Sequence, residues 1–216
     1  MKAKEALREM MSRAMMDQLG SYLAQCRVRS PLVEAEDAHY PPSKEETMFL
    51  LDYLKKQRLG PAISGSVGLL HHIGGDVKSF RPTYDLDIWV NKDPGAPPKG
   101  WRKDLESIGV VSWISPTGGY VDFMTPGHEF PGGAKTPRSV GIDTSFGYPV
   151  VRWLDLMRLK LNSMRAKDMT DLIALVRKIG KVPTAGELGS LNRTQRENLD
   201  MILQWFKARP IGGYGE

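Results

Sequence analysis

Two aspartates lie two residues apart in the stretch RPTYDLDIWV, which covers residues 81–90. The apolar residues around Asp85 and Asp87 are typical of a β-strand, and residues two apart in a strand lie on the same face. Two neighbouring carboxylates repel each other, so they need a cation, a cationic side chain or a raised pKa. Mg²⁺ prefers such oxygen ligands together with substrate phosphates. The pair therefore indicates either a metal site or a solvated strand edge.

A third carboxylate, Asp122, stands in the apolar stretch GYVDFMT, residues 119–125. An unpaired charge inside an apolar strand is costly. If this strand lies beside the first one, Asp122 completes a cluster of three carboxylates with Asp85 and Asp87. Such a cluster is hard to explain without metal, and two carboxylates can share a pair of ions about 4 Å apart.

A Gly65-Ser66 turn stands between a short strand and a helical pattern in PAISGSVGLLHHIGG. Glycine allows a phosphate to come close to the backbone, and the amides at the start of a helix attract negative charge. A Gly-Ser turn on its own is more often an ordinary turn. Before a pair of aspartates, it indicates a site for the phosphates of a nucleotide.

The spacing of apolar residues predicts the elements that hold these side chains. An amphipathic helix is expected over residues 3–26, and Ser43 with Glu46 predicts a capping box that starts a second helix, ending near Gln57. Further helices are predicted from the Gly-Ser turn to Gly74, over 101–108, over 151–179 with a break near Lys167-Asp168, and over 194–207. Strands are predicted at 83–90, 110–115 and 119–125, and a loop-rich segment at 127–141.

This order of elements predicts an α+β fold, with a small mixed sheet, flanking helices and a C-terminal helical segment. We expect three parts: an N-terminal helical segment over residues 1–59, a catalytic core over 60–150 and the C-terminal helical segment over 151–216.

The composition narrows the class of protein. A chain of 216 residues with 41% hydrophobic residues can bury a substantial core. The single cysteine, Cys26, excludes an internal disulfide and a cysteine-rich metal site. No apolar run reaches the length of a membrane span and the N-terminus lacks a signal-peptide core, so we expect a cytoplasmic protein with no membrane partner. The net charge of +5 is compatible with a nucleic-acid ligand or with a solvated basic surface.

The three stretches SGSVGLLHHIGG, RPTYDLD and YVDFMT together resemble the nucleotidyltransferase superfamily related to DNA polymerase β. That superfamily has a Gly-Ser or Gly-Gly turn opening a helix, two aspartates on the next strand and a third acid on a later strand. The R-x-T-x-D-L-D pattern is similar to one branch, the nucleotidyltransferase toxins of abortive-infection and toxin–antitoxin systems. The resemblance implies that Arg81 and Thr83 also belong to the nucleotide site.

The resemblance continues in PVVRWLDLMRLKLNSMRAKDMTDLIAL, where Lys160 matches the lysine of that branch. Lys160 is therefore expected to reach the triphosphate. Lys167, Asp168 and Asp171 match the charged residues that follow in that branch. Arg165 and Asp168 are three residues apart, and Lys167 and Asp171 are four apart, so these four residues also fit a set of salt bridges on a helix surface.

The resemblance implies a nucleotidyltransferase that uses two Mg²⁺ ions and a nucleoside triphosphate such as ATP. Asp85, Asp87 and Asp122 would bind the metal and carry the catalysis, while Gly65 and Ser66 would hold the phosphates. A nucleoside monophosphate would pass to an acceptor hydroxyl, with RNA or tRNA favoured over a protein or a small molecule. The toxin-like branch also implies an antitoxin or another protein partner.

Two further interpretations come from other classes of protein. The same fold could serve as a non-catalytic module that binds a nucleotide or RNA, although the presence of all three acids argues against a decayed site. The methionine-rich N-terminal helix could also provide a surface for a protein partner.

Overall fold

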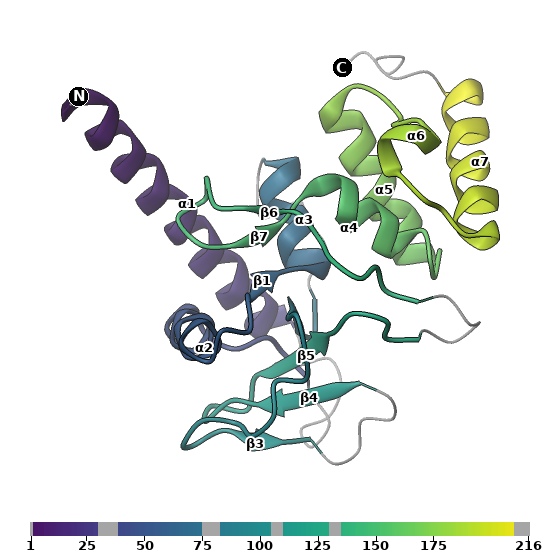
Figure 1. The fold of residues 1–216 in the computed structure, drawn as a ribbon. Helices are drawn as coiled ribbons and strands as arrows, with labels where there is room; N and C mark the ends of the chain where they lie inside the picture. Colours follow the sequence, from purple (N-terminus) through teal and green to yellow (C-terminus); the bar gives the residue numbers. More distant parts are fainter. Residues whose placement is uncertain (1, 30–38, 75–82, 105–109, 130–134, 210–216) are drawn as a thin grey trace.

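A computed structural model of the chain describes residues 2–29, 39–74, 83–104, 110–129 and 135–209. The helices are α1 (Lys2–Arg29), α2 (Lys44–Lys56), α3 (Gly65–Ile73), α4 (Trp153–Lys160), α5 (Ala166–Ile179), α6 (Ala185–Leu188) and α7 (Arg193–Ala208). The strands are β1 (Ala62–Ile63), β2 (Leu86–Trp89), β3 (Arg102–Lys103), β4 (Val111–Ile114), β5 (Tyr120–Met124), β6 (Ile142–Asp143) and β7 (Val150–Val151). A mixed sheet with helices around it confirms the predicted α+β class (Figure 1).

The strands form one sheet in the order β3-β4-β5-β2-β1-β7-β6. At its centre, β2 runs parallel to β5 and antiparallel to β1. The parallel pair places Asp87 opposite Asp122, and Ile88 opposite Phe123. Because side chains alternate along each strand, this register puts the two aspartates on one face and the apolar residues on the other.

The apolar face of the sheet packs against α1 and α2. Ile88 and Phe123 belong to a buried cluster that includes Leu23 of α1 and Leu54 of α2. The helix α2 begins where its sequence predicts, because the Ser43 hydroxyl accepts a hydrogen bond from the Glu46 amide at 3.1 Å. The Glu46 carboxylate in turn accepts the Ser43 amide at 2.9 Å, which completes the predicted capping box.

A second buried cluster joins α3 to the helices that follow the sheet. It contains Leu69 of α3, Met157 of α4, Leu172 of α5 and Ile202 of α7. Figure 1 shows α4 to α7 grouped on the side of α3 that lies away from α1 and α2. The division of the chain into three parts stays a prediction.

The structure corrects three local predictions. The segment predicted as a helix over 101–108 pairs Arg102 and Lys103 with β4 as a short strand, while residues 105–109 lie outside the description. The break in the helical segment lies between Lys160 and Ala166, earlier than predicted, because the Asp168 carboxylate accepts the backbone amide of Arg165 and starts α5 there. The strand around the two aspartates begins only at Leu86.

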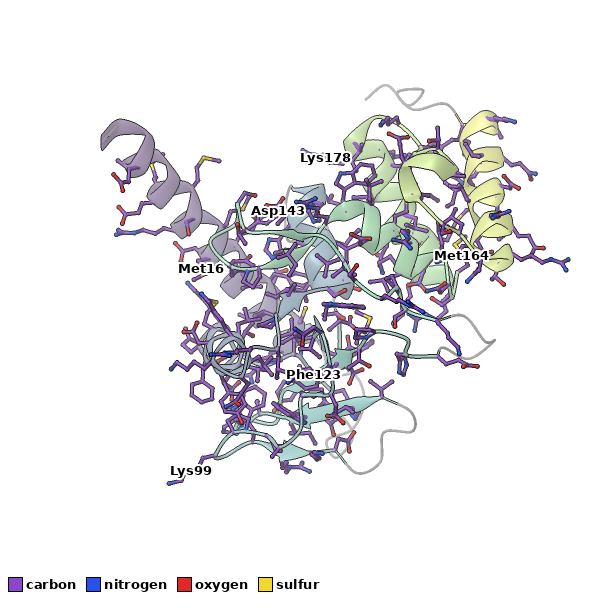
Figure 2. All side chains as sticks on the ribbon, viewed as in Figure 1. Met16, Lys99, Phe123, Asp143, Met164 and Lys178 are labelled. Carbon is purple, nitrogen blue, oxygen red and sulfur yellow. The ribbon has the colours of Figure 1, made fainter. Side chains whose placement is uncertain are left out.

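Among the described side chains of α1, the apolar ones that pack against the core, including Met16 (Figure 2), lie from the middle of the helix onward. Leu19, Leu23 and Cys26 are buried, whereas Met10 and Met11 are 62% and 53% exposed. The first turns of α1 extend away from the sheet in Figure 1. None of the described helices combines the length and the apolar character needed to cross a membrane.

We expect Ser43→Ala to lower the free energy of unfolding by about 1 kcal/mol, because the amide of Glu46 loses its hydrogen-bond acceptor. Urea denaturation followed by circular dichroism measures the change. Ser139 is exposed, and Ser139→Ala serves as the control, with an expected change within about 0.5 kcal/mol. Equal stability of the two variants would show that the cap does not stabilise α2.

Candidate active site

Asp85, Asp87 and Asp122 form what we call the acid face of the sheet. Asp87 and Asp122 are direct partners on the parallel strands β2 and β5, and Asp85 lies two residues before Asp87. The sequence predicts that these carboxylates lie close together, and the register of β2 and β5 places Asp87 directly beside Asp122. All three side chains are partly exposed to solvent, so a ligand can reach them.

The negative charge of the acid face is only partly compensated. Burial, followed by the charges of Asp85 and Asp122, raises the pKa of Asp87 from an ordinary 3.8 to about 8, although Lys160 and Lys167 oppose the shift. Burial also raises the pKa of Asp122, and the charge of Asp85 adds to this effect. A bound cation would favour the ionised form of both groups.

Gly65 brings the start of α3 into contact with Asp87. Its backbone has φ +55°, a left-handed conformation that favours glycine, and a Cβ atom at this position would overlap the Asp87 carboxylate. The Ser64 amide also donates to the Asp87 carbonyl at 2.9 Å. The predicted Gly65-Ser66 turn therefore opens a helix directly beside the acid face, where the amides and the helix dipole favour anionic groups.

The serines of this turn are enclosed by protein. Ser66 is buried, with 6% of its surface exposed. The neighbouring Ser64 is fully buried, and its hydroxyl has no hydrogen-bond partner among the described residues. Any contact of this turn with a ligand would therefore come from its backbone amides rather than from the Ser64 hydroxyl.

Hydrogen bonds from neighbouring side chains orient two of the three aspartates. The Thr83 hydroxyl donates to Asp85 at 2.9 Å, and Thr83 itself is buried. Thr83 therefore positions a carboxylate, and its predicted contact with a nucleotide stays a prediction. Arg81, the other predicted nucleotide ligand on this segment, lies outside the described residues.

Asp122 has neighbours that the sequence analysis did not identify. The Ser112 hydroxyl of β4 donates to Asp122 at 2.5 Å and opposes the rise of its pKa. The charge of His39 acts in the same direction, and the His39 ring stacks on Tyr120 at 3.7 Å between centroids. The alternation in VVSWIS places Ser112 on one face of a strand, but only the pairing of β4 with β5 shows that it meets Asp122.

Lys160 is buried and paired with two acids of α5. Its ammonium group donates to Asp171 at 2.5 Å and to Asp168 at 3.3 Å. Asp168 also accepts bonds from Ser163 at 2.8 Å and from Arg165 at 2.8 Å. Burial tends to raise the pKa of Asp168, but these bonds and charges outweigh it and lower the pKa to about 2. The structure thus contains the Arg165–Asp168 pair that the sequence spacing allowed, and it pairs Asp171 with Lys160, while the pairing of Lys167 with Asp171 stays a prediction.

The end of α4 and the start of α5 also supply positive charge to the acid face. The charges of Lys160 and Lys167 lower the pKa of Asp87, while those of Asp87 and Asp85 contribute to a raised pKa of Arg165, after its bond to Asp168. The Arg165 side chain is 61% exposed. These positively charged side chains near the aspartates could therefore contact a bound triphosphate.

The donors of the acid face suit Mg²⁺ in kind, since three carboxylates lie together and repel each other. Within the described ranges, however, no group of three or more His, Cys, Asp or Glu side chains is arranged to hold a metal ion.

The comparisons with known proteins give a fold likeness only. No protein-family model matches the sequence, and no curated protein matches it either. The structure is similar to the crystal structure of an antigenic nucleotidyltransferase-like protein from Paracoccidioides brasiliensis. The sequences are 19% identical, the match covers 79% of this chain and 91% of that chain, and the TM-score is 0.47. A likeness this distant does not tell what the present chain binds or catalyses.

The raised pKa of Asp87 predicts how the stability depends on pH. Between pH values near 4 and 8 the folded chain holds a proton on Asp87 that the unfolded chain has released, so the free energy of unfolding falls as the pH rises through this window. Asp87→Asn should remove this decline. Thermal unfolding of both proteins in EDTA at several pH values measures it, and parallel curves for the two would contradict the shift.

Removal of the Lys160 charge should destabilise the fold. Lys160→Gln leaves Asp168 and Asp171, whose side chains are each 1% exposed, without their shared cation. We expect a loss of about 3 kcal/mol or more in the free energy of unfolding, measured by urea denaturation. Lys178→Gln on the exposed surface of α5 is the matched control, with little change expected. A stable Lys160→Gln protein would show that Lys160 is not needed for folding.

Proposed function

We propose that the chain is a Mg²⁺-dependent nucleotidyltransferase. The observation that supports this best is the in-register pairing of Asp87 with Asp122, directly beside the glycine that opens α3. Carboxylates for a metal and helix amides for phosphates are thereby placed together. This combination suits transfer from a nucleoside triphosphate, in which positioning and charge neutralisation provide most of the rate.

Each part of the site has a role in this reaction. Asp85, Asp87 and Asp122 would hold Mg²⁺, which when bound neutralises phosphate charge. The backbone at Gly65 and Ser66 would contact the triphosphate, and Arg165 and Lys167 would add positive charge from the start of α5. Lys160 would act mainly by keeping this part of α5 in place, through Asp168 and Asp171.

Asp122 would accept the proton of the acceptor hydroxyl. Its raised pKa makes it a stronger base than an ordinary aspartate, and the Ser112 hydroxyl fixes its orientation. The hydroxyl oxygen then forms a bond to the α-phosphorus, and the bond from the α-phosphorus to the bridging oxygen breaks. Pyrophosphate leaves, and the acceptor carries a nucleoside monophosphate.

The proposed acceptor and biological role rest on the net charge and on the sequence motifs. The basic net charge and the toxin-like sequence motifs favour RNA, such as a tRNA, as the acceptor. The same motifs favour a cytoplasmic toxin–antitoxin component with ATP or another triphosphate as donor. These choices are supported by sequence resemblance.

We expect the wild-type chain to transfer label from an α-labelled nucleoside triphosphate to cellular RNA and to release pyrophosphate in the presence of Mg²⁺. Asp85→Asn and Asp87→Asn should each reduce transfer by about 100-fold or more, because each removes charge from the metal site. Asp52→Asn, an exposed change on α2 that removes the same charge, should transfer normally. Undiminished transfer by Asp87→Asn would overturn the proposal.

One observation favours a second candidate, a non-catalytic module that binds a nucleotide or RNA. The three aspartates do not form a metal-binding group as they stand in the described structure. Calorimetry with a nucleoside triphosphate separates the two functions. Binding that is unaffected by Mg²⁺, with no pyrophosphate released, indicates the module, whereas Mg²⁺-dependent binding with pyrophosphate release indicates the enzyme.

A further inference from the structure

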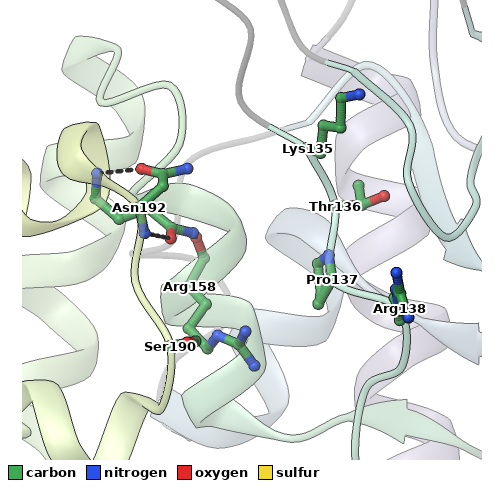
Figure 3. A pocket seen from close by; sticks show the side chains of 8 residues that line it. Lys135, Thr136, Pro137, Arg138, Arg158, Ser190 and Asn192 are labelled. Carbon is green, nitrogen blue, oxygen red and sulfur yellow. Dashed lines mark hydrogen bonds between the residues drawn. The ribbon is translucent and has the colours of Figure 1, made fainter.

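A polar pocket of about 370 Å³ lies apart from the acid face, and we call it the basic pocket. One wall is the segment that contains Lys135 and Arg138, and the other is formed by Arg158 of α4 and the residues around Asn192 that lead into α7. Figure 3 shows these two walls facing each other across the opening. Three of its eight lining residues are cationic and none of them is acidic, so the pocket suits an anionic ligand. Its volume falls in the range of ligand sites, roughly 300–1,000 Å³.

Arg158 has hydrogen-bonding capacity that the described residues leave unused. Its Nη1 donates to Asp155 at 3.2 Å, but its Nε is buried and has no partner among the described residues. The Asp155 carboxylate has a second partner, because its other oxygen accepts a hydrogen bond from the Gly141 amide at 2.7 Å. A buried donor without an acceptor is costly. A phosphate oxygen is a strong acceptor for such a guanidinium group.

The wall opposite Lys135 is held firmly by the start of α7. The Asn192 side chain accepts the Gln195 amide at 2.8 Å, and the Gln195 side chain accepts the Asn192 amide at 3.0 Å. Gln195 also donates to the Arg158 carbonyl at 3.0 Å, which ties α7 to α4. The positive end of the dipole of α7 therefore lies at the pocket, where Asn192 and Gln195 line the wall.

The wall that carries Lys135 and Arg138 is attached to the end of β5. The Thr136 amide donates to the His128 carbonyl at 2.8 Å, and the Thr136 hydroxyl donates to the Thr125 carbonyl at 2.5 Å. Lys135 and Arg138 are both exposed. Lys135 pairs with the exposed Glu129 at 3.4 Å, and such a surface pair is weak and easily exchanged for another anion.

We propose that the basic pocket binds backbone phosphates of an RNA chain. Thr125, which holds this wall, follows Asp122 by three residues, or about 10 Å along an extended chain. An RNA whose end reaches Asp122 would thus pass the pocket within a few nucleotides. The phosphate chemistry comes from the pocket itself, whereas the choice of RNA over free phosphate rests on the proposed function.

The test measures binding of a fluorescently labelled single-stranded RNA by anisotropy over a series of salt concentrations, without nucleoside triphosphate. The double variant Lys135→Gln/Arg138→Gln removes two exposed cations from the pocket. We expect weaker binding and a salt dependence, plotted as log affinity against log salt, that is shallower by about 1.4, or 0.7 for each lost phosphate contact.

The matched control is Lys55→Gln/Lys56→Gln, which removes the same charge from exposed positions at the end of α2. Its salt dependence should equal that of the wild type. An equal loss in both double variants, or no loss in the pocket variant, would overturn the proposal. Arg158→Gln, with its fold checked by circular dichroism, should also bind RNA more weakly.

Inorganic phosphate alone separates the two sources of the ligand. If calorimetry shows that inorganic phosphate binds the wild type but not the pocket variant, and RNA binding is the same in both, the pocket holds free phosphate and the RNA proposal is wrong. Because these assays involve no catalysis, they succeed or fail independently of label transfer. Loss of transfer in Asp87→Asn with normal RNA binding would leave the pocket assignment intact.

Discussion

Repulsion among carboxylates is the constraint on which the rest of this structure depends. The parallel pairing of β2 and β5 brings Asp87 and Asp122 together, with Asp85 just before β2, and burial together with the charges of Asp85 and Asp122 raises the pKa of Asp87. Positive charge at the end of α4 and the start of α5 partly compensates these carboxylates. The buried bonds of Lys160 to Asp168 and Asp171 hold these two helix ends in place. The packing of α4 against α5 thereby positions positive charge near the aspartates of the sheet.

The alternation of side chains along a single strand can be predicted from the sequence, whereas the pairing of one strand with another cannot. In YDLDIWV and YVDFMT, an acid beside apolar residues on both sides was enough to predict which face each side chain takes. The contact between Ser112 and Asp122 depends on the pairing of β4 with β5, a non-local choice that no spacing within VVSWIS reveals.

Errors at element boundaries have similar local causes. Residues 101–104 have no strong strand pattern, and Arg102 and Lys103 become a strand only because β4 offers a free edge. The start of α5 differs from its predicted place because Asp168 accepts the Arg165 backbone amide, and the spacing of these two residues also fits a side-chain ion pair within a longer helix. The capping box at Ser43 was located correctly, since all its partners lie within four residues.

The contact between Gly65 and Asp87 links two positions that are far apart in the sequence. A side chain at position 65 would need both the space of the Asp87 carboxylate and a left-handed backbone that it rarely adopts. Substitution at 65 is therefore incompatible with the present place of that carboxylate, so the two residues are expected to persist or disappear together during divergence. Among related chains, a residue larger than glycine at position 65 is therefore expected only where the carboxylate at position 87 has been lost or displaced.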